Sequence, residues 1–299
     1  MFAGMTAVSP APEKAAQALP RMGREPHIID MLIEERAPKL SASAAWPLVR
    51  PLLYRMLDYA KARRMADAIA PMPGREAMEF VSELLALKVT ANGLNRIPPT
   101  GRLVVVCNHP TGIADGVAVY DALKTIRPDI CFYANSDAHR VSARFDEVLI
   151  PVEWVEAKRT RERTRVTLQL TREALEAERC LVIFPAGRLA RKSPDGLLAD
   201  PPWAPTAVSI ARRHETSVLP VHVAGPWSAL FHFFNRFSPE LRDVTLFHEL
   251  LNKQGREFSL TVGAPIAAEA LAGEAAEVVE RLKHHVERVL ATEAERPFA

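Results

Sequence analysis

From residue 87 onward, short apolar segments alternate with amphipathic ones, and this alternation constrains the fold more than any other feature of the chain. The apolar segments have the length and composition of strands, whereas the segments between them repeat apolar residues at helical spacing. Such alternation predicts an α/β fold, with a largely parallel sheet flanked by helices. We expect strands in LKVTA, LVVVCN, ICFYAN, EVLIPVEWV, CLVIFP, VLPVHVAG and FSLTVGAPI, and helices in ADGVAVYDALKTI, TRERTRVTLQLTREALEAE and EAAEVVERLKHHVERVLATEAE.

The chain divides by composition into three parts. Residues 1–26 are rich in Ala and Pro and predict a disordered tail, residues 27–86 predict an N-terminal amphipathic helical region, and residues 87–299 form the α/β domain. Residues 46–70 predict a basic amphipathic helix that either lies in a membrane interface or packs on its own domain. Its expected apolar side consists of Trp46, Leu48, Leu52, Leu53, Met56, Leu57 and Tyr59.

Charge, hydropathy and cysteine content limit the possible partners. The net charge of +2 does not indicate a nucleic-acid partner, and no stretch of 18 apolar residues predicts a transmembrane helix. Three cysteines without a CxxC pair argue against a disulfide framework or a zinc site, so we expect Cys107, Cys131 and Cys180 to be small core residues in a reducing compartment. Two basic clusters, 158–165 and 188–192, predict a solvated face or a surface for phosphate or anionic lipid.

The segment VVVCNHPTGIADG, residues 104–116, places a histidine just after a predicted strand. Ligands of open α/β sheets bind at the carboxyl ends of strands, so His109 is a candidate catalytic residue. Asp115 follows six positions later, and on an ideal helix this spacing would rotate the two side chains apart by about 240°. Gly112 permits a turn through which they can meet. They are then a base and the carboxylate that orients it; the alternative is a capping histidine and a helix-starting aspartate.

Three sequence blocks together resemble the glycerolipid (PlsC-like) lysophospholipid acyltransferase family. They are CNHPTGIADG, LVIFPAGRLAR and SVLPVHVAG, in the order and at distances that fit the family, and the resemblance covers about residues 85–265. Five residues separate His109 from Asp115, where the common family pattern has four. The five-residue form, together with FPAGR, resembles bacterial relatives linked to haemolysin-like proteins and ornithine-lipid acylation.

The second and middle blocks depart from the family pattern. Ala186 occupies the glutamate position, Arg188 the threonine position and Leu189 the arginine position. In the middle block, IPVEWVEAKR, Trp154 occupies the usual arginine position and Arg159 lies nearby. These departures leave the identity of the acceptor lipid open, and the resemblance to relatives linked to ornithine-lipid acylation favours a bacterial lipid other than lysophosphatidate.

The resemblance implies direct acyl transfer without a metal or organic cofactor. An acceptor hydroxyl gives its proton to His109 and attacks the thioester carbonyl of acyl-CoA or acyl carrier protein, while Asp115 orients the imidazole. Backbone N–H groups around Gly187 are the expected oxyanion donors, and nearby arginines would bind an anionic head group or the donor's phosphates. The expected substrate-binding residues are Asn108, Arg159, Gly187, Arg188 and Arg191.

The expected partners are a lyso-lipid acceptor, an acyl-CoA or acyl carrier protein donor, and an anionic membrane surface at the cytoplasmic face, to which the protein would attach peripherally. Two other enzymatic hypotheses stay open: an acceptor based on an amino acid or a sugar, and a hydrolase that passes the acyl group to water. A further alternative is a catalytically inactive, membrane-surface lipid-binding protein of the same fold. The residue changes in the second block favour it, whereas the presence of His109 and Asp115 opposes it.

Overall fold

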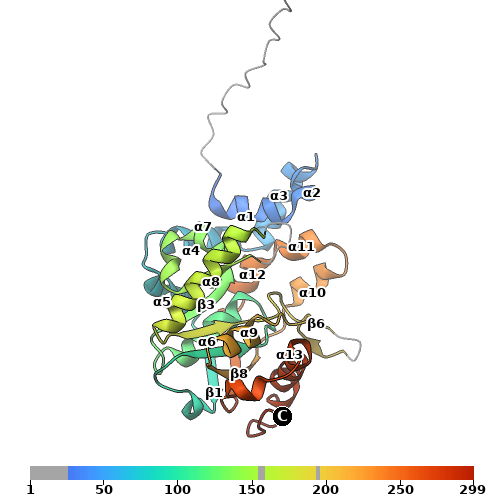
Figure 1. Ribbon diagram of the computed structural model, residues 1–299. Helices are drawn as coiled ribbons and strands as arrows, with labels where there is room; N and C mark the ends of the chain where they lie inside the picture. The colour runs from blue at the N-terminus through green and yellow to red at the C-terminus, as the bar shows by residue number, and fades with distance from the viewer. Residues whose placement is uncertain (1–25, 154–158, 193–195) are drawn as a thin grey trace, which may run out of the picture.

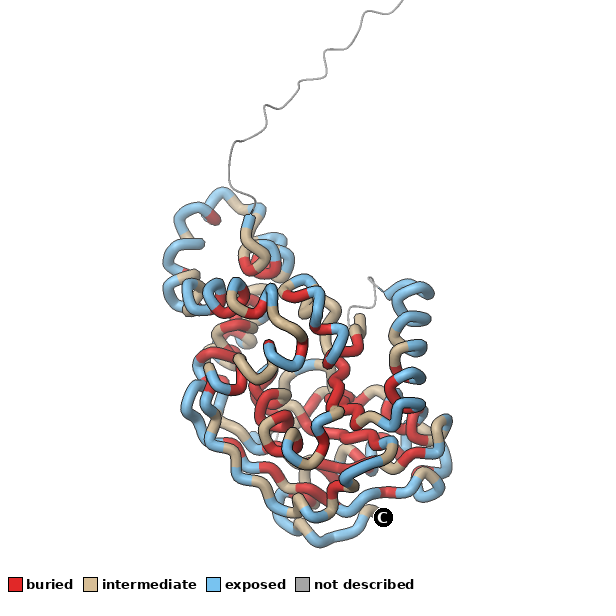
Figure 2. The backbone as a smooth tube through the Cα atoms, turned by 90° about the vertical axis from the view of Figure 1, so that its left-hand side faces the viewer, coloured by how far each residue is buried: buried red, intermediate tan, exposed pale blue. Residues whose placement is uncertain are grey.

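The computed structural model describes residues 26–153, 159–192 and 196–299. Most of the expected N-terminal tail and Trp154 lie outside these residues. The described chain forms a central sheet with helices packed on both faces, and the two cores lie between sheet and helices (Figures 1 and 2). The predicted α/β fold is therefore confirmed.

Seven strands form the sheet: β1 (Lys88–Asn92), β2 (Leu103–Cys107), β3 (Ile130–Asn135), β4 (Leu149–Val152), β5 (Cys180–Ile183), β8 (Ser217–Ala224) and β9 (Glu257–Val262). Their order across the sheet is β1-β9-β8-β2-β5-β3-β4. All neighbouring pairs are parallel except β8 and β9, which are antiparallel. The sheet is thus largely parallel, as the sequence predicts.

Strand β2 lies in the middle of the sheet and is buried along its whole length. Leu103, Val105 and Cys107 pack into one core, whereas Val104 and Val106 pack into the other. An apolar run without polar alternation suits a strand that is covered on both faces. The chain that follows Cys107 therefore emerges at the centre of the carboxyl edge.

The helices form one layer on each face of the sheet (Figure 1). The first core includes residues of α1 (Ile28–Arg36), α4 (Tyr59–Ile69), α5 (Gly74–Leu85), α6 (Ile113–Leu123) and α12 (Leu246–Leu251). The second includes residues of α8 (Arg161–Glu176), α9 (Thr206–Arg213) and α13 (Ala275–His284). The N-terminal helices therefore share a core with the sheet.

Shorter elements connect these layers. They are α2 (Pro38–Ser41), α3 (Trp46–Met56), α7 (Ala138–Val141), α10 (Ala229–Asn235), α11 (Pro239–Asp243), the 3₁₀ turns η1 (Leu94–Arg96), η2 (Ala143–Glu147) and η4 (Ala268–Leu271), and the π-helical turn η5 (His285–Val289). Strands β6 (Arg191–Lys192) and β7 (Leu198–Ala199) form a separate antiparallel pair. This pair leads the chain back toward the carboxyl edge of the sheet.

The single helix expected over residues 46–70 is wrong, because the chain forms two helices there, α3 and α4. They are separated at Asp58, whose left-handed φ of 54° interrupts helical geometry. Helix α4 buries its apolar side in the first core, whereas Leu48 and Leu52 of α3 are 83% and 72% exposed. The expected apolar side is therefore divided between the core and the surface, with Trp46, Leu53 and Leu57 buried.

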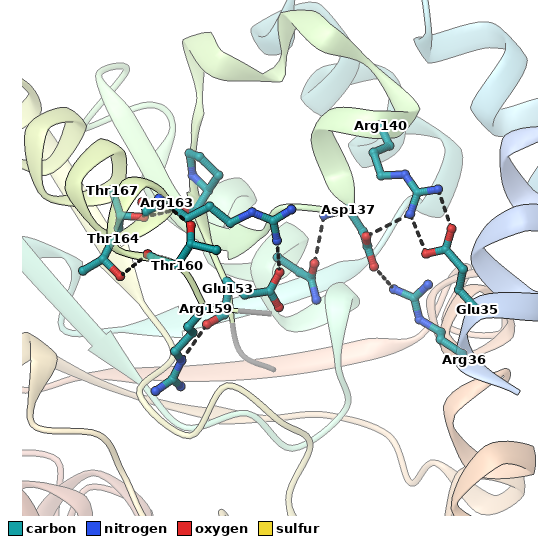
Figure 3. Close-up of polar contacts among 12 residues, drawn as sticks. Glu35, Arg36, Asp137, Arg140, Glu153, Arg159, Thr160, Arg163, Thr164 and Thr167 are labelled. Atoms are coloured by element: carbon teal, nitrogen blue, oxygen red, sulfur yellow. Dashed lines mark hydrogen bonds and ion pairs between the residues drawn. The ribbon is translucent and has the colours of Figure 1, made fainter. Parts of the chain in front are cut away.

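Ion pairs attach helix α1 to helix α7 (Figure 3). Arg36 Nη2 donates to Asp137 at 2.7 Å, and Arg140 donates through both terminal nitrogens to the carboxylate of Glu35, each at 2.7 Å. Such two-point arginine–carboxylate contacts fix orientation as well as distance. The N-terminal helices are thereby joined to the segment that follows β3.

Candidate active site

Asn108 fixes the direction in which the chain leaves β2. Its side-chain amide donates to the carbonyl of Val223 at 2.9 Å, and its Oδ1 accepts from the N–H of Val223 at 2.7 Å. The side chain thus extends the pairing between β2 and β8 by one residue. These two hydrogen bonds hold the turn after β2, and the expected role of Asn108 in substrate binding stays a prediction.

His109 and Asp115 meet at the carboxyl edge of the sheet. Nδ1 of His109 lies 2.9 Å from Oδ2 of Asp115, and this carboxylate is fully buried. Oδ2 also accepts from the backbone N–H groups of Thr111 and Gly112 at 2.8 and 2.9 Å, and the Thr111 hydroxyl lies 2.5 Å from Oδ1. Four hydrogen-bonding groups thus surround the carboxylate and fix its position. The other ring nitrogen, Nε2, is left on the opposite side of the imidazole.

The turn at Gly112 explains how a six-residue spacing can bring the two side chains together. Gly112 has φ 101° and directly precedes α6, so the residues before it do not follow the helix. Asp115 stands at the third position of α6, where a carboxylate caps the free N–H groups of a helix start. A Cβ at position 112 would also lie 3.3 Å from Leu189, the residue at the family's arginine position. The backbone conformation therefore favours glycine here, and any side chain would also require a small shift of Leu189.

Two segments distant in sequence hold the main chain of His109. Its N–H faces both carboxylate oxygens of Asp200 at 3.1 Å, and its carbonyl accepts from the N–H of Ala190 at 2.9 Å. The imidazole packs against Phe184 with 4.6 Å between ring centroids. Sequence reasoning missed Asp200, because nothing in its neighbourhood resembles a motif and its contact spans 91 positions.

A pocket of about 300 Å³ lies next to this arrangement and brings together three of the expected substrate-binding residues. Its wall is formed by Arg159, Pro185, Ala186, Gly187, Arg188, Pro201, Pro202, Trp203 and Ala204. Trp203 also donates its indole N–H to Asp200 at 2.9 Å. The pocket wall and the main chain of His109 therefore share one carboxylate.

Gly187, in the wall of the pocket, lies in a hydrogen-bonded turn. The N–H of Gly187 donates to the carbonyl of Phe184 at 3.0 Å, so this proton is already engaged. Gly187 adopts φ 60° in the tight turn after β5. Gly187 lines the pocket, and an oxyanion-binding role for the backbone N–H groups around it stays a prediction.

The arginines expected to bind anions differ in environment. Arg188 is exposed at the pocket, and Arg159 lines it while its Nε donates to the carbonyl of Glu153 at 3.0 Å (Figure 3). Arg191 is partly buried, and burial together with the positive charges of Arg242 and Arg188 lowers its pKa. Its Nε is buried and makes no hydrogen bond to any described residue. An anion bound at Arg191 would relieve both unfavourable features.

The three cysteines are buried, as expected. Among the described residues, no group of three or more His, Cys, Asp or Glu side chains could hold a metal ion. Nor is any helix in the described ranges long and apolar enough to cross a bilayer.

Comparison with known proteins places these features in a family. A family model described as acyltransferase matches residues 32–290. Two relatives are named lyso-glycine lipid O-acyltransferase. The protein from Phocaeicola vulgatus is 26% identical, and the match covers 64% of this chain and 69% of the relative. The protein from Bacteroides thetaiotaomicron is 24% identical, and the match covers 64% of this chain and 71% of the relative. The crystal structure of the 1-acyl-sn-glycerophosphate acyltransferase PlsC from Thermotoga maritima matches with 16% identity and a TM-score of 0.48, over 75% of this chain and 82% of that one. Since the family model spans most of its length, this chain belongs to the acyltransferase family.

Proposed function

We propose that this protein transfers a fatty acyl group from a thioester donor, acyl-CoA or acyl carrier protein, to the hydroxyl of a lyso-lipid, with His109 as the general base. The observation that carries the proposal is the contact between His109 Nδ1 and the buried carboxylate of Asp115 at 2.9 Å. A carboxylate in this position fixes the tautomer with hydrogen on Nδ1 and directs the lone pair of Nε2 toward substrate. The arrangement is that of a serine-hydrolase base, with the acceptor hydroxyl in place of a protein nucleophile.

In the proposed reaction, the acceptor oxygen forms a bond to the thioester carbonyl carbon while its proton moves to Nε2 of His109. The tetrahedral intermediate then collapses, the carbon–sulfur bond breaks, and the proton passes from the imidazolium to the leaving thiolate. Three backbone or hydroxyl donors hold the carboxylate of Asp115 in place in addition to the imidazole. The product is an ester and a free thiol.

The acceptor that we propose is a lyso-lipid built on an amino acid. Both relatives are named for such an acceptor, a lyso-glycine lipid. The partly buried Arg191, with the exposed Arg188 close enough to lower its pKa, would bind the anionic group of the acceptor. A guanidinium matches a carboxylate through two parallel hydrogen bonds, and this match would orient the acceptor as well as hold it.

We further propose that the protein attaches peripherally to an anionic membrane through α3. Leu48 and Leu52 form an exposed apolar pair on this helix, and Arg50 and Arg55 lie between and beside them in sequence. An exposed apolar stripe with neighbouring basic residues is the composition of interfacial helices. Attachment there would deliver a lipid acceptor to the enzyme without extraction into water.

A direct test combines purified protein, labelled acyl-CoA or acyl carrier protein, and three acceptors: lyso-glycine lipid, lyso-ornithine lipid and lysophosphatidate. We expect labelled diacyl product with an amino-acid acceptor, and a loss of at least about a hundredfold in His109→Ala. His214→Ala is the matched control, because His214 lies before β8, at the opposite edge of the sheet. Acceptor-independent release of fatty acid would establish a hydrolase instead, and lipid binding without turnover would establish an inactive binding protein.

A further inference from the structure

A buried carboxylate outside the sequence blocks lies against the main chain of His109. Asp200 follows β7 and is only 5% exposed. It accepts from the N–H of His109 through both oxygens at 3.1 Å, and from the indole N–H of Trp203 at 2.9 Å. One carboxylate thus connects the proposed base to a wall of the neighbouring pocket.

The surroundings of Asp200 make its negative charge costly. Burial, and to a smaller extent the neighbouring Glu287, raise the pKa of Asp200 to about 7, although hydrogen bonds from Trp203 and His109 oppose this rise. The N–H of Asp200 donates to Glu287 at 2.5 Å, and Lys283 offsets the charge of Glu287 through an ion pair at 3.1 Å. The buried Cys107 thiol also lies near Asp200. Burial, and to a smaller extent the negative charges of Asp115 and Asp200, raise the pKa of Cys107 well above its usual value.

We infer that Asp200 is a positioning residue for acyl transfer: its carboxylate holds the main chain of His109 and couples it to the pocket wall at Trp203. This inference rests on the proposed role of His109 as general base. Without the carboxylate, the His109 N–H loses its acceptor, and of the contacts described above only the Ala190 hydrogen bond would hold the main chain. Displacement of a catalytic group by about 1 Å costs on the order of a hundredfold in rate.

The charge of Asp200 has a second effect on the same residue. The imidazole of His109 becomes positively charged as it takes the acceptor's proton, and a nearby carboxylate in a site of low dielectric stabilises that charge. Asp115 acts at the ring and Asp200 at the backbone, so the two carboxylates support His109 from different sides. A costly buried charge is retained at a place where catalysis uses it.

The test compares Asp200→Asn with Asp129→Asn. Asparagine at position 200 preserves the shape of the side chain and one acceptor oxygen but removes the negative charge. Asp129 is the control, because it pairs with Arg127 just before β3, at the opposite edge of the sheet. We expect kcat of Asp200→Asn to fall by about 10- to 100-fold, with KM for the acyl donor changed less than about threefold. The slope of log kcat against pH below pH 7 should also become shallower, because one ionisation has been removed.

Thermal stability separates positioning from a merely structural role. The raised pKa means that folded Asp200 binds a proton more tightly than unfolded Asp200, so its contribution to stability falls as pH rises from about 4 to about 7. Asparagine resembles the neutral form, and Tm of Asp200→Asn at pH 8 should therefore equal or exceed that of wild type. A structural residue would instead show Tm and kcat falling together, and Asp129→Asn should lower Tm while kcat stays within about threefold.

Trp203→Phe provides a second, independent variant should Asp200→Asn not fold. The Trp203 hydrogen bond lowers the pKa of Asp200, so its loss should move the acid limb of the kcat profile to higher pH. The inference is overturned if this limb stays in place, or if folded Asp200→Asn turns over within twofold of wild type. Full activity in His109→Ala would instead refute the proposed base, and so the two failures can be told apart.

Discussion

Oδ2 of Asp115 lies 2.9 Å from Nδ1 of His109, although six positions separate the residues and a regular helix would turn them apart. The contact forms because the helix begins only at Ile113, and the chain before it folds back over the carboxylate. The same oxygen that faces the imidazole also caps the start of α6 through two backbone N–H groups. Orientation of the proposed base and initiation of the helix are thus two functions of one atom.

Replacement of Asp115 by asparagine should reduce kcat by about 10²- to 10⁴-fold. The amide brings N–H donors toward a site that already contains donors from Thr111 and Gly112, and it no longer stabilises a charged imidazole. Steady-state assays of Asp115→Asn beside Asp121→Asn, another aspartate of α6, will check this expectation. Equal rates in the two variants would contradict the proposed pair.

Thr111→Val should lower kcat about tenfold and the free energy of unfolding by about 1–3 kcal/mol, because Oδ1 of Asp115 loses its buried hydroxyl partner. Thr216→Val is the matched control. Its hydroxyl is equally buried and donates to the carbonyl of Arg102 at 2.9 Å, near the opposite edge of the sheet. Urea denaturation and acyl-transfer assays should show both variants destabilised but only Thr111→Val impaired in kcat.

Gly225→Ala should disturb the site through packing. A Cβ at position 225 would lie 2.6 Å from a ring carbon of Phe258 and 2.7 Å from the Thr111 methyl group. Overpacking of this kind costs about 1–3 kcal/mol, and here the displaced threonine contacts Asp115. Gly116→Ala offers the contrast, because position 116 lies inside α6 with its nearest neighbour 4.0 Å away. Thermal melts should show Gly225→Ala less stable and Gly116→Ala more stable than wild type.

His222 should make the protein less stable in mild acid. Burial lowers the pKa of His222, whose Nδ1–H donates to the carbonyl of Val286 at 2.9 Å. As pH falls below about 6.5, the unfolded chain therefore takes up a proton that the folded chain resists, and stability declines by at most about 1.4 kcal/mol per pH unit. His222→Asn keeps a donor but cannot titrate. Denaturation at pH 7.5, 6.5 and 5.5 should show a smaller decline in this variant; identical slopes would rule out the contribution.

Leu48→Ser combined with Leu52→Ser should weaken attachment to anionic vesicles without loss of fold. Both side chains are exposed, so their replacement removes apolar surface available to a bilayer and little from the core. Flotation with anionic and neutral vesicles measures the effect, and Leu168→Ser, at an exposed position of α8, is the control. If wild type itself fails to float with either vesicle, membrane attachment through α3 is wrong.

The sequence predicted most of the sheet because its signals are local. Apolar runs such as the one that forms β2 carry their own periodicity, and the turn at Gly112 lies within the same short segment as His109 and Asp115. The division between α3 and α4 was not predicted, because no residue pattern around Asp58 indicates the left-handed conformation that this residue adopts. Nor were the pairing of Asn108 with β8 and the contact of Asp200 with His109, since both join segments about a hundred positions apart.

The hydrogen bonds that hold the main chain of His109 extend to a distant part of the sequence. The histidine is held by Asp200, and the N–H of Asp200 in turn requires Glu287, near the end of the described chain. A fragment that contains every recognisable sequence block but stops before residue 287 would lack this last acceptor. The segment that holds the main chain of His109 would then lose one of its own hydrogen bonds, although all the residues around the imidazole are present.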